Sequence, residues 1–183
     1  QAFLFAHALV ELRHFCGEVV SVQAQMAPSK RSFENEDLAA AVLCFENGAI
    51  ATISVSDSIV APWSWEMTSR EYPIYPQISE SCYLIGGSEA SLSVPDLSLW
   101  AHPGKRSWWE PLSATQHPRS NSDPLINQIE HFAAVIRSET PPLVSGEEGL
   151  KTMIVLDAIQ RAAMGQQLVC IENFDGVTLK EVS

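Results

Sequence analysis

The stretch LAAAVLCFENGAIATISVSDS at residues 38–58 decides the class of the fold. In it, Asn47 and Gly48 lie between two runs that are rich in apolar and β-branched residues. Asn-Gly in that setting is the strongest short hairpin signal, because both residues readily take the positive φ angles that a two-residue turn needs. The sequence therefore predicts a sheet that is at least partly antiparallel.

Further strands are expected on both sides of this hairpin. The segment at 18–26 alternates Val and Ala with polar residues, which predicts a half-buried strand. Segments 81–87 and 90–102 predict a second hairpin across Gly86-Gly87, and segment 107–112 is a candidate for the last strand. Together these strands are expected to form essentially one meander.

Helices are expected at both ends of the chain. Segment 3–16 places apolar residues at helical spacing and is followed by Gly17, a residue type that commonly ends helices. Asp123-Pro124 predicts the start of a second helix, since Asp accepts backbone N–H bonds and Pro fits the first helical position. The apolar stripe of that second helix consists of Leu125, Ile129, Phe132 and Ile136.

A third helix is expected from about 147 to 164, between a capping box of Ser145 with Glu148 and a terminating Gly165. The residues expected on its buried side are Leu150, Ile154, Ala158 and Ala162. Strands in one block with helices at both ends predict the α+β class: an open, predominantly antiparallel sheet with helices packed on one face. Because no internal repeat or low-complexity segment interrupts the chain, residues 1–183 are expected to form a single domain.

The composition excludes several classes of function. Of the 183 residues, 46% are hydrophobic and 18% charged, as in soluble globular proteins, and the apolar runs are too short to span a membrane. The net charge of −11, without a cluster of Lys and Arg, argues against binding to nucleic acid or anionic lipid. The cysteines are single and have no CxxC spacing, which favours reduced thiols in a cytoplasmic protein over disulfides or zinc. They are Cys16, Cys44, Cys82 and Cys170.

Few residues suggest chemistry by themselves. His7 has a side chain that can act as a general acid or base near neutral pH, although a histidine in a helix can also serve only packing. The loop at 63–76 mixes aromatic residues with Pro and carries Arg70, a composition suited either to enclosing a small polar ligand or to packing on the sheet. Gly86-Gly87 lies between two strands and so predicts a turn rather than a nucleotide-binding loop. Three tryptophans, Trp100, Trp108 and Trp109, are too many for a small sheet to bury, which favours self-association.

Several segments together resemble the C-terminal domain of the Gfo/Idh/MocA family, the relatives of glucose-fructose oxidoreductase and inositol dehydrogenase. The similarity rests on the order and spacing of segments along nearly the whole chain. The most specific of them are FENGA, IGGSEASL, and the closing pair HFAAVI and PLVSGEEGL. Members of that family carry an N-terminal Rossmann domain, which holds NAD or NADP, and a lysine in a Glu-Lys-Pro motif. The sequence contains neither, so the resemblance implies a piece of a longer enzyme and no cofactor bound by this piece alone.

The resemblance also implies roles for particular residues. The family pattern H-x-x-D-x-x-R, followed by a glycine four residues later, is matched by His7 as the catalytic residue and by Arg13 as a substrate-binding residue, with Gly17 after them. Val10 stands where the pattern has aspartate, and Phe3 stands where an aspartate often precedes the histidine. The residues of the 63–76 loop that the resemblance implies as substrate contacts are Trp65, Arg70 and Tyr75.

The leading hypothesis is therefore a substrate-binding and oligomerisation domain of an NAD(P)-dependent oxidoreductase. The parent enzyme would transfer hydride between nicotinamide and a sugar, polyol or cyclic alcohol, and the domain alone would not turn over. A homo-oligomer, either a dimer or a tetramer, is expected through the open face of the sheet. Val10 and Phe3 motivate an alternative, a non-catalytic assembly or ligand-sensing module of the same fold, and an independent hydrolase is a weaker third hypothesis.

Overall fold

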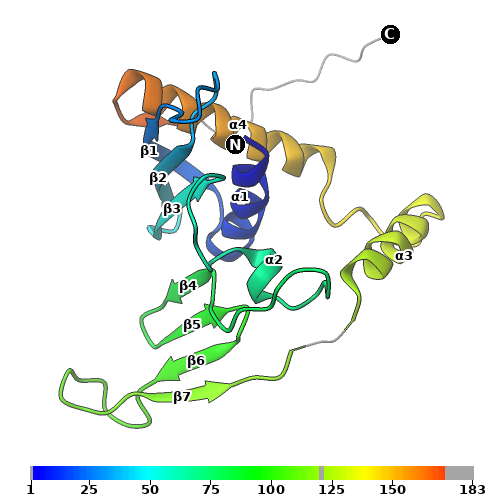
Figure 1. Ribbon diagram of the computed structural model, residues 1–183. Coiled ribbons are helices and arrows are strands. Elements are labelled where there is room, and N and C mark those ends of the chain that lie inside the picture. Colours follow the sequence, from blue (N-terminus) through cyan, green and yellow to red (C-terminus); the bar gives the residue numbers. More distant parts are fainter. Residues whose placement is uncertain (1, 120–121, 172–183) are drawn as a thin grey trace. The chain divides into compact units, whose positions relative to one another are not determined.

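The computed structural model describes residues 2–119 and 122–171 (Figure 1). Its contacts divide the chain into two compact units, Gln1–Ile59 with Leu143–Ser183 as the first and Val60–Pro142 as the second. Each unit contains one four-stranded antiparallel sheet, so the predicted α+β class and antiparallel pairing are confirmed. The strands form two sheets rather than one, and the single domain expected over the whole chain stays a prediction.

The first unit is a sheet with strand order β3-β2-β1-β8, covered on one face by two helices. Its strands are β1 (Val19–Ala27), β2 (Leu38–Phe45), β3 (Ile50–Ser56) and β8 (Val169–Cys170), and its helices are α1 (Ala2–Cys16) and α4 (Gly146–Gly165). Helix α4 packs on β1, and α1 packs on α4. The predicted hairpin at Asn47-Gly48 joins β2 to β3, with Gly48 at a φ of +84°.

Alternation along the strands divides the first sheet into a buried and an open face. On the buried face, Val22 of β1 and Leu43 of β2 are 0% exposed and pack with Ile159 of α4 and Leu9 of α1. The side chains between them on β1, β2 and β3 point to the other face, where they are largely polar or small. Helices on one side and an uncovered face on the other agree with the layer arrangement that the sequence predicted.

The buried side of α4 was predicted in part: Ala158 and Ala162 are buried as expected, but Leu150 and Ile154 are not. Leu150 and Ile154 are only half-buried, and the buried residues are Thr152, Val155, Ala158, Ile159 and Ala162. Thr152 is buried with them because its hydroxyl donates to the Glu148 carbonyl and accepts from Arg13, a partner that lies far away in the sequence. Gly165 is the last helical residue, and Gln166 takes the left-handed conformation that ends the helix.

The second unit is a meander with strand order β4-β5-β6-β7. Its strands are β4 (Tyr83–Gly86), β5 (Ala90–Val94), β6 (Ser98–Ala101) and β7 (Ser113–Gln116), and its helices are α2 (Trp65–Thr68) and α3 (Pro124–Ile136). The hairpin predicted across Gly86-Gly87 is confirmed, as is the start of α3 at Pro124 with Asp123 as its N-cap. The strand proposed at 107–112 is wrong: this segment forms turns, and the last strand begins after Pro111, which has no N–H for a sheet.

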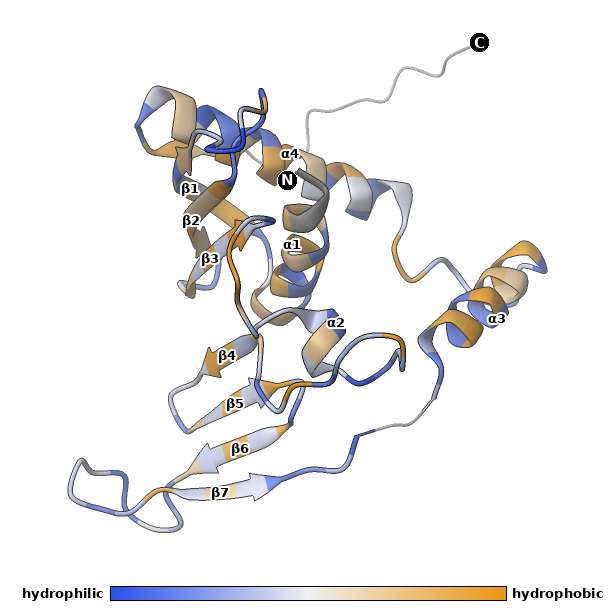
Figure 2. Ribbon diagram, viewed as in Figure 1, coloured by the Kyte–Doolittle hydropathy of each residue, from blue (hydrophilic) through white to orange (hydrophobic). Residues whose placement is uncertain are grey.

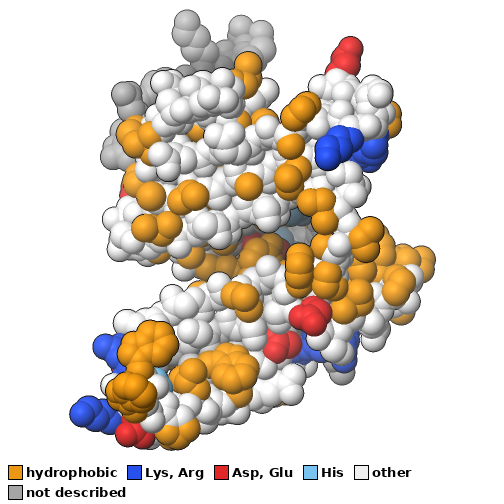
Figure 3. Space-filling model, turned by 60° about the vertical axis from the view of Figure 1, so that its left-hand side comes forward, with side chains coloured by type: hydrophobic (Ala, Val, Ile, Leu, Met, Phe, Trp, Pro, Cys, Tyr) orange, Lys and Arg blue, Asp and Glu red, His pale blue; other side chains and the backbone are white. Residues whose placement is uncertain are grey.

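Hydrophobic side chains of the second unit are unusually exposed. The stripe on α3 was predicted correctly in its spacing, but Leu125, Ile129, Phe132 and Ile136 are 53% to 68% exposed, and orange bands mark this helix in Figure 2. Trp108 and Trp109, in the loop between β6 and β7, are 99% and 94% exposed. Figure 3 shows large hydrophobic side chains gathered with charged ones at the tip of this unit. Self-association through these residues stays a prediction.

Candidate active-site helix and its surroundings

Helix α1 carries His7 as an exposed side chain. A helical residue turns about 100° from its neighbour, so Val10, Glu11 and His14 lie on the same side of α1 as His7. These three residues also line a cavity of about 480 Å³ in the first unit. His7 itself is not among the residues that line this cavity; it lies about one turn before Val10 and Glu11, on the same side of α1.

The cavity combines an apolar side with charged groups. Phe15 of α1 and Leu143 with Val144, just before α4, supply apolar surface. The other lining residues are Val10, Glu11, Arg13, His14, Glu18 and Glu148. Such a mixture can enclose the carbon skeleton of a small molecule and bond its polar groups.

Arg13 is the most extensively bonded of the predicted site residues. Its Nε and Nη2 atoms donate to the two carboxylate oxygens of Glu18 at 2.9 and 2.8 Å. Nη2 also donates to Glu148 Oε2 at 2.7 Å, and Nη1 donates to the Glu148 carbonyl and to Thr152 Oγ1, both at 3.0 Å. All five N–H groups of the guanidinium thus have acceptors within the protein.

Lys151 completes this group, which we name the Arg13 cluster: Arg13, Glu18, Glu148, Lys151 and Thr152. Lys151 Nζ lies 3.1 Å from both Glu18 Oε1 and Glu148 Oε1. Hydrogen bonding from Arg13 holds the pKa of Glu18 below its ordinary value, and hydrogen bonding from Lys151, followed by Arg13, does so for Glu148. The pKa values of Arg13 and Lys151 are raised, mainly by hydrogen bonding to Glu18.

These contacts bear on the role expected of Arg13. Its side chain is 4% exposed, and its donors point to acceptors on the chain segment after α1 and on α4. A substrate hydroxyl would have to displace one of those acceptors, so the contacts support a role in holding α1 against α4. The substrate-binding role of Arg13 stays a prediction.

The sequence predicted Glu148 as a helix-capping residue but not as a partner of Arg13 and Lys151. The predicted capping box is present on one side, because Ser145 Oγ accepts from the Glu148 N–H at 3.3 Å. The Glu148 carboxylate bonds Arg13 and Lys151, which lie close only once α1 has packed on α4. Glu18 and Lys151 were missed, and their charges alone gave no signal that they would meet.

The predicted substrate contacts of the aromatic loop belong to the second unit. There, Trp65 donates its indole N–H to Glu71 at 2.8 Å, and Arg70 donates to Ser79 Oγ at 2.8 Å. Tyr75 packs against Tyr72 with ring centroids 5.9 Å apart. Trp65 is thus the first residue of α2, and Arg70 and Tyr75 lie on the loop that follows this helix, while His7 and Arg13 lie in the first unit.

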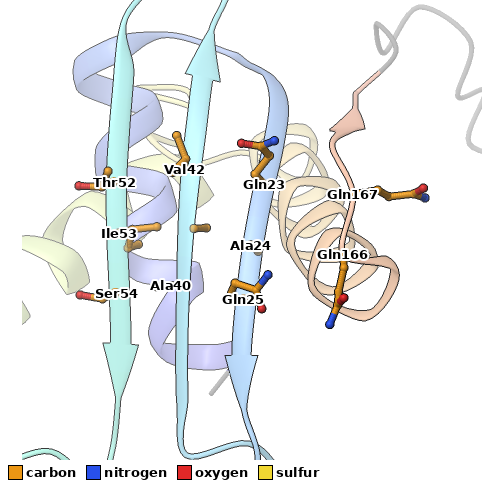
Figure 4. Close-up of a pocket in the computed structure, with 11 residues that line it drawn as sticks. Gln23, Ala24, Gln25, Ala40, Val42, Thr52, Ile53, Ser54, Gln166 and Gln167 are labelled. Carbon is orange, nitrogen blue, oxygen red and sulfur yellow. The ribbon is translucent and has the colours of Figure 1, made fainter.

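A shallow groove of about 520 Å³ lies on the open face of the first sheet. Figure 4 shows Gln23 and Gln25 of β1, Val42 of β2 and Thr52 with Ser54 of β3 along it. The remaining lining residues are Ala24, Ala40, Ala41, Ile53, Gln166 and Gln167. The groove has amide and hydroxyl groups but no ionisable side chain among these residues.

The chain has one pair of adjacent glycines, and a dinucleotide-binding loop needs its glycines at a helix N-terminus. Gly86 and Gly87 lie in an antiparallel hairpin, where the Gly87 N–H donates to the Ala90 carbonyl, so they do not present a helix N-terminus to a pyrophosphate. The chain's own glycine pair therefore does not fit a nicotinamide dinucleotide. Within residues 2–119 and 122–171, no three His, Cys, Asp or Glu side chains are grouped as metal ligands, and the four cysteines are free thiols.

One further feature concerns membranes. Of the helices that the structure describes, none combines the length and the apolar character that a membrane span requires.

The family of the protein follows from comparison with known sequences. The sequence model of the oxidoreductase family Gfo/Idh/MocA, C-terminal alpha/beta domain, matches residues 6–171. The chain belongs to this family, as the resemblance of its segments indicated. No curated protein matches the chain at comparable significance.

Solved structures share the fold at low sequence identity. An oxidoreductase from Agrobacterium radiobacter in complex with NAD+, L-tartaric acid and magnesium has a TM-score of 0.62 at 18% identity, over 90% of this chain and 47% of that one. An aldose-aldose oxidoreductase from Caulobacter crescentus complexed with glycerol has a TM-score of 0.62 at 21% identity, over 91% and 45%. The WlbA dehydrogenase from Bordetella pertussis, in complex with NADH and UDP-GlcNAcA, has a TM-score of 0.55 at 21% identity, over 92% and 43%. The chain therefore spans less than half the length of each of these structures.

Proposed function

We propose that this chain is the substrate-binding and oligomerisation part of an NAD(P)-dependent oxidoreductase, with His7 as its acid-base residue. The observation that carries the proposal is the exposed position of His7 on the side of α1 that borders the 480 Å³ cavity. Membership of the oxidoreductase family supports the class of reaction. A histidine suits the role because it can bind or release a proton near neutral pH.

The division of labour follows from which groups the chain has. The proposed hydride carrier is a nicotinamide nucleotide, and the glycine pair of this chain, Gly86-Gly87, lies in a hairpin and presents no helix N-terminus to its pyrophosphate. What the chain contributes is a side chain that takes or returns the proton of a substrate hydroxyl, together with surfaces that orient the substrate. Trp65, Arg70 and Tyr75 are proposed as additional substrate contacts.

The proposed substrates are sugars, polyols or cyclic alcohols. The cavity beside α1 supports this class, since the imidazole of His14 can bond hydroxyls while Leu143 and Val144 contact carbon. Ligands in the similar structures, such as glycerol and L-tartaric acid, are hydroxylated molecules bound by those proteins. The four free thiols support the further proposal of a reducing, cytoplasmic compartment.

The test uses the full polypeptide that the gene encodes. NADH or NADPH formation is followed across a panel of aldoses, inositols and linear polyols, for the unmodified protein and for His7→Ala. We expect turnover of at least one substrate and a loss in kcat of about 100-fold or more in the variant, the range for an acid-base residue. His117→Ala is the matched control because His117 is also exposed but lies in the second unit. An inactive polypeptide, or equal loss in both variants, would contradict the proposal.

A second measurement concerns the cofactor. Calorimetry with NAD and NADP on the 183-residue chain alone is expected to give no heat of specific binding at micromolar concentrations. Micromolar binding by the chain alone would show that it holds the nucleotide itself, and the proposed division of labour would be wrong.

Oligomerisation is proposed through the open face of the first sheet. The groove residues that support this are short or uncharged, so a second copy could approach without burying an unpaired charge. Val42→Arg places a charge at the centre of this face and is expected to reduce the mass measured by light scattering to that of a monomer. Gln160→Arg, on the exposed side of α4, is the control and should leave the mass unchanged. A monomeric unmodified protein would refute the proposal.

The alternative function is a non-catalytic assembly or ligand-sensing module. Val10 favours it, because an apolar residue occupies the position at which the family pattern has an acid. Turnover that is unaffected by His7→Ala, or ligand binding without turnover, would favour this alternative.

A further inference from the structure

Glu11 is the starting point, because one of its carboxylate oxygens has no partner. Across the part of the chain that the structure describes, Glu11 Oε2 is the one buried side-chain oxygen or nitrogen that makes no hydrogen bond. A buried carboxylate oxygen without a donor is costly, since the hydration that it loses is not replaced. We therefore expect Glu11 Oε2 to accept a hydrogen bond in the functional state of the protein.

The two cations of the Arg13 cluster, Arg13 and Lys151, are bonded to other carboxylates. The guanidinium of Arg13 donates all five N–H groups to Glu18, Glu148 and Thr152. Lys151 lies between Glu18 and Glu148, and its ammonium bonds both of them. The donor for Glu11 is therefore not drawn from the Arg13 cluster.

Helix geometry directs Glu11 toward His7. Residues separated by four positions lie one above the other on a helix, and long helical side chains lean toward the N-terminus, over the preceding turn. Glu11 follows His7 by four positions on α1, so its carboxylate extends toward the imidazole. His14, on the same side of the helix, follows Glu11 and lies on the side from which its side chain leans away.

We propose that Glu11 is the positioning residue of His7: its carboxylate accepts a hydrogen bond from one ring N–H and so directs the other ring nitrogen toward the cavity. The inference rests on the proposed acid-base role of His7 and adds a partner on the same helix. A carboxylate bonded to one nitrogen fixes the tautomer and the orientation of the neutral ring. The substrate itself meets His7, while Glu11 acts through it.

The position of Glu11 explains why Val10 need not exclude catalysis. Val10 and Glu11 are adjacent residues that both line the cavity. An acid at residue 11 reaches the histidine along the helix axis, so α1 keeps a carboxylate beside His7 although position 10 is apolar.

The first arm of the test is spectroscopic and uses the chain itself. Nitrogen-15 spectra of the His7 ring give the ratio of its two neutral tautomers for the unmodified chain, Glu11→Met and Glu11→Gln. Methionine keeps length and helix propensity but accepts no comparable hydrogen bond, so we expect the ratio to change about fivefold, which corresponds to about 1 kcal/mol. Glutamine retains an acceptor oxygen and should restore part of the ratio. Glu46→Gln, in the exposed turn after β2, is the control.

The second arm measures turnover in the full polypeptide. Glu11→Met is expected to lower kcat about 10-fold to 100-fold with KM unchanged, because the ring is misdirected but the substrate is still bound. A raised KM with normal kcat would make Glu11 a substrate ligand and overturn the inference. A tautomer ratio that is the same in the unmodified chain and in Glu11→Met would also overturn it.

The two arms separate this inference from the proposed function. If the full polypeptide oxidises no substrate but Glu11→Met changes the tautomer ratio, the proposed function fails and the pairing of Glu11 with His7 stands. If the enzyme is active, depends on His7 and is insensitive to Glu11→Met, the proposed function stands and the inference fails.

Discussion

Replacing Arg13 by methionine tests the reasoning about the Arg13 cluster most directly. The substitution keeps much of the apolar stem but removes five hydrogen bonds and two ion pairs. Breaking a fully buried ion pair costs about 3–5 kcal/mol, because the remaining charge is left unpaired. Here the side chains of Glu18 and Glu148 are 34% and 42% exposed, so water and Lys151 can compensate them in part.

The expected loss in the free energy of unfolding is therefore about 3 kcal/mol. For a chain of this size that corresponds to a fall in Tm of about 6–12 °C. The assay is urea unfolding followed in parallel by circular dichroism and by tryptophan fluorescence. All five tryptophans lie in the second unit, so fluorescence follows that unit. Of the two signals, only circular dichroism also reports on α1 and α4. The midpoint by circular dichroism should fall, and a larger shift in it than in the fluorescence midpoint would locate the damage in the first unit.

Arg137→Met is the matched control. Arg137 forms one ion pair with Glu139 on the surface, where both side chains are more than half exposed. Its loss is expected to change stability by less than about 0.5 kcal/mol. A loss of less than about 1 kcal/mol for Arg13→Met would refute the view that the Arg13 cluster anchors α1 to α4.

Three further outcomes are expected. The carboxylates of the Arg13 cluster have pKa values below their ordinary 4.5. The stability that they contribute is therefore present above that pH and is lost as the pH falls through the folded-state pKa values. Urea midpoints measured between pH 6 and pH 3 should fall less steeply in Arg13→Met than in the unmodified chain. Ile159→Ala opens the core where the side chain is 1% exposed and should cost about 2–5 kcal/mol in urea unfolding, whereas Met153→Ala at a 59% exposed site of the same helix should cost less than about 1 kcal/mol. Gly48→Ala should lower the free energy of unfolding by about 1–2 kcal/mol, because its φ of +84° is unfavourable for a residue with a Cβ. Gly104→Ala is the control: the added Cβ also meets open space, but φ is not positive, so thermal unfolding should hardly change.

Local signals in the sequence were sufficient for most of the elements. Asn47-Gly48 fixed a hairpin and Asp123-Pro124 fixed a helix start, because turn and cap preferences depend on a few adjacent residues. The segment at 107–112 was misassigned for a related reason: its aromatic residues favour a strand, but the Pro that follows them interrupts pairing.

Chain-distant contacts account for what was missed at the site. His7 was proposed from its place in a motif, whereas Glu148, a partner of Arg13, lies 135 residues away from it in sequence. Neither Glu18 nor Lys151 stands in a pattern that marks it as part of a site. The unpartnered oxygen of Glu11 is likewise a property of burial, which no spacing of residues along the chain records.

The sequence by itself determined the class of fold, its hairpins, the order of its elements and the family, since these follow from preferences of neighbouring residues and from motif order. Only the tertiary structure decided which residues of α4 are buried and that the strands form two sheets. It also decided that Arg13 turns inward to Glu18 and Glu148 while Glu11 keeps a buried oxygen without a hydrogen bond. The physical reason is that burial and charge pairing depend on segments far apart in the chain, whose meeting is set by how the helices and sheet pack as a whole.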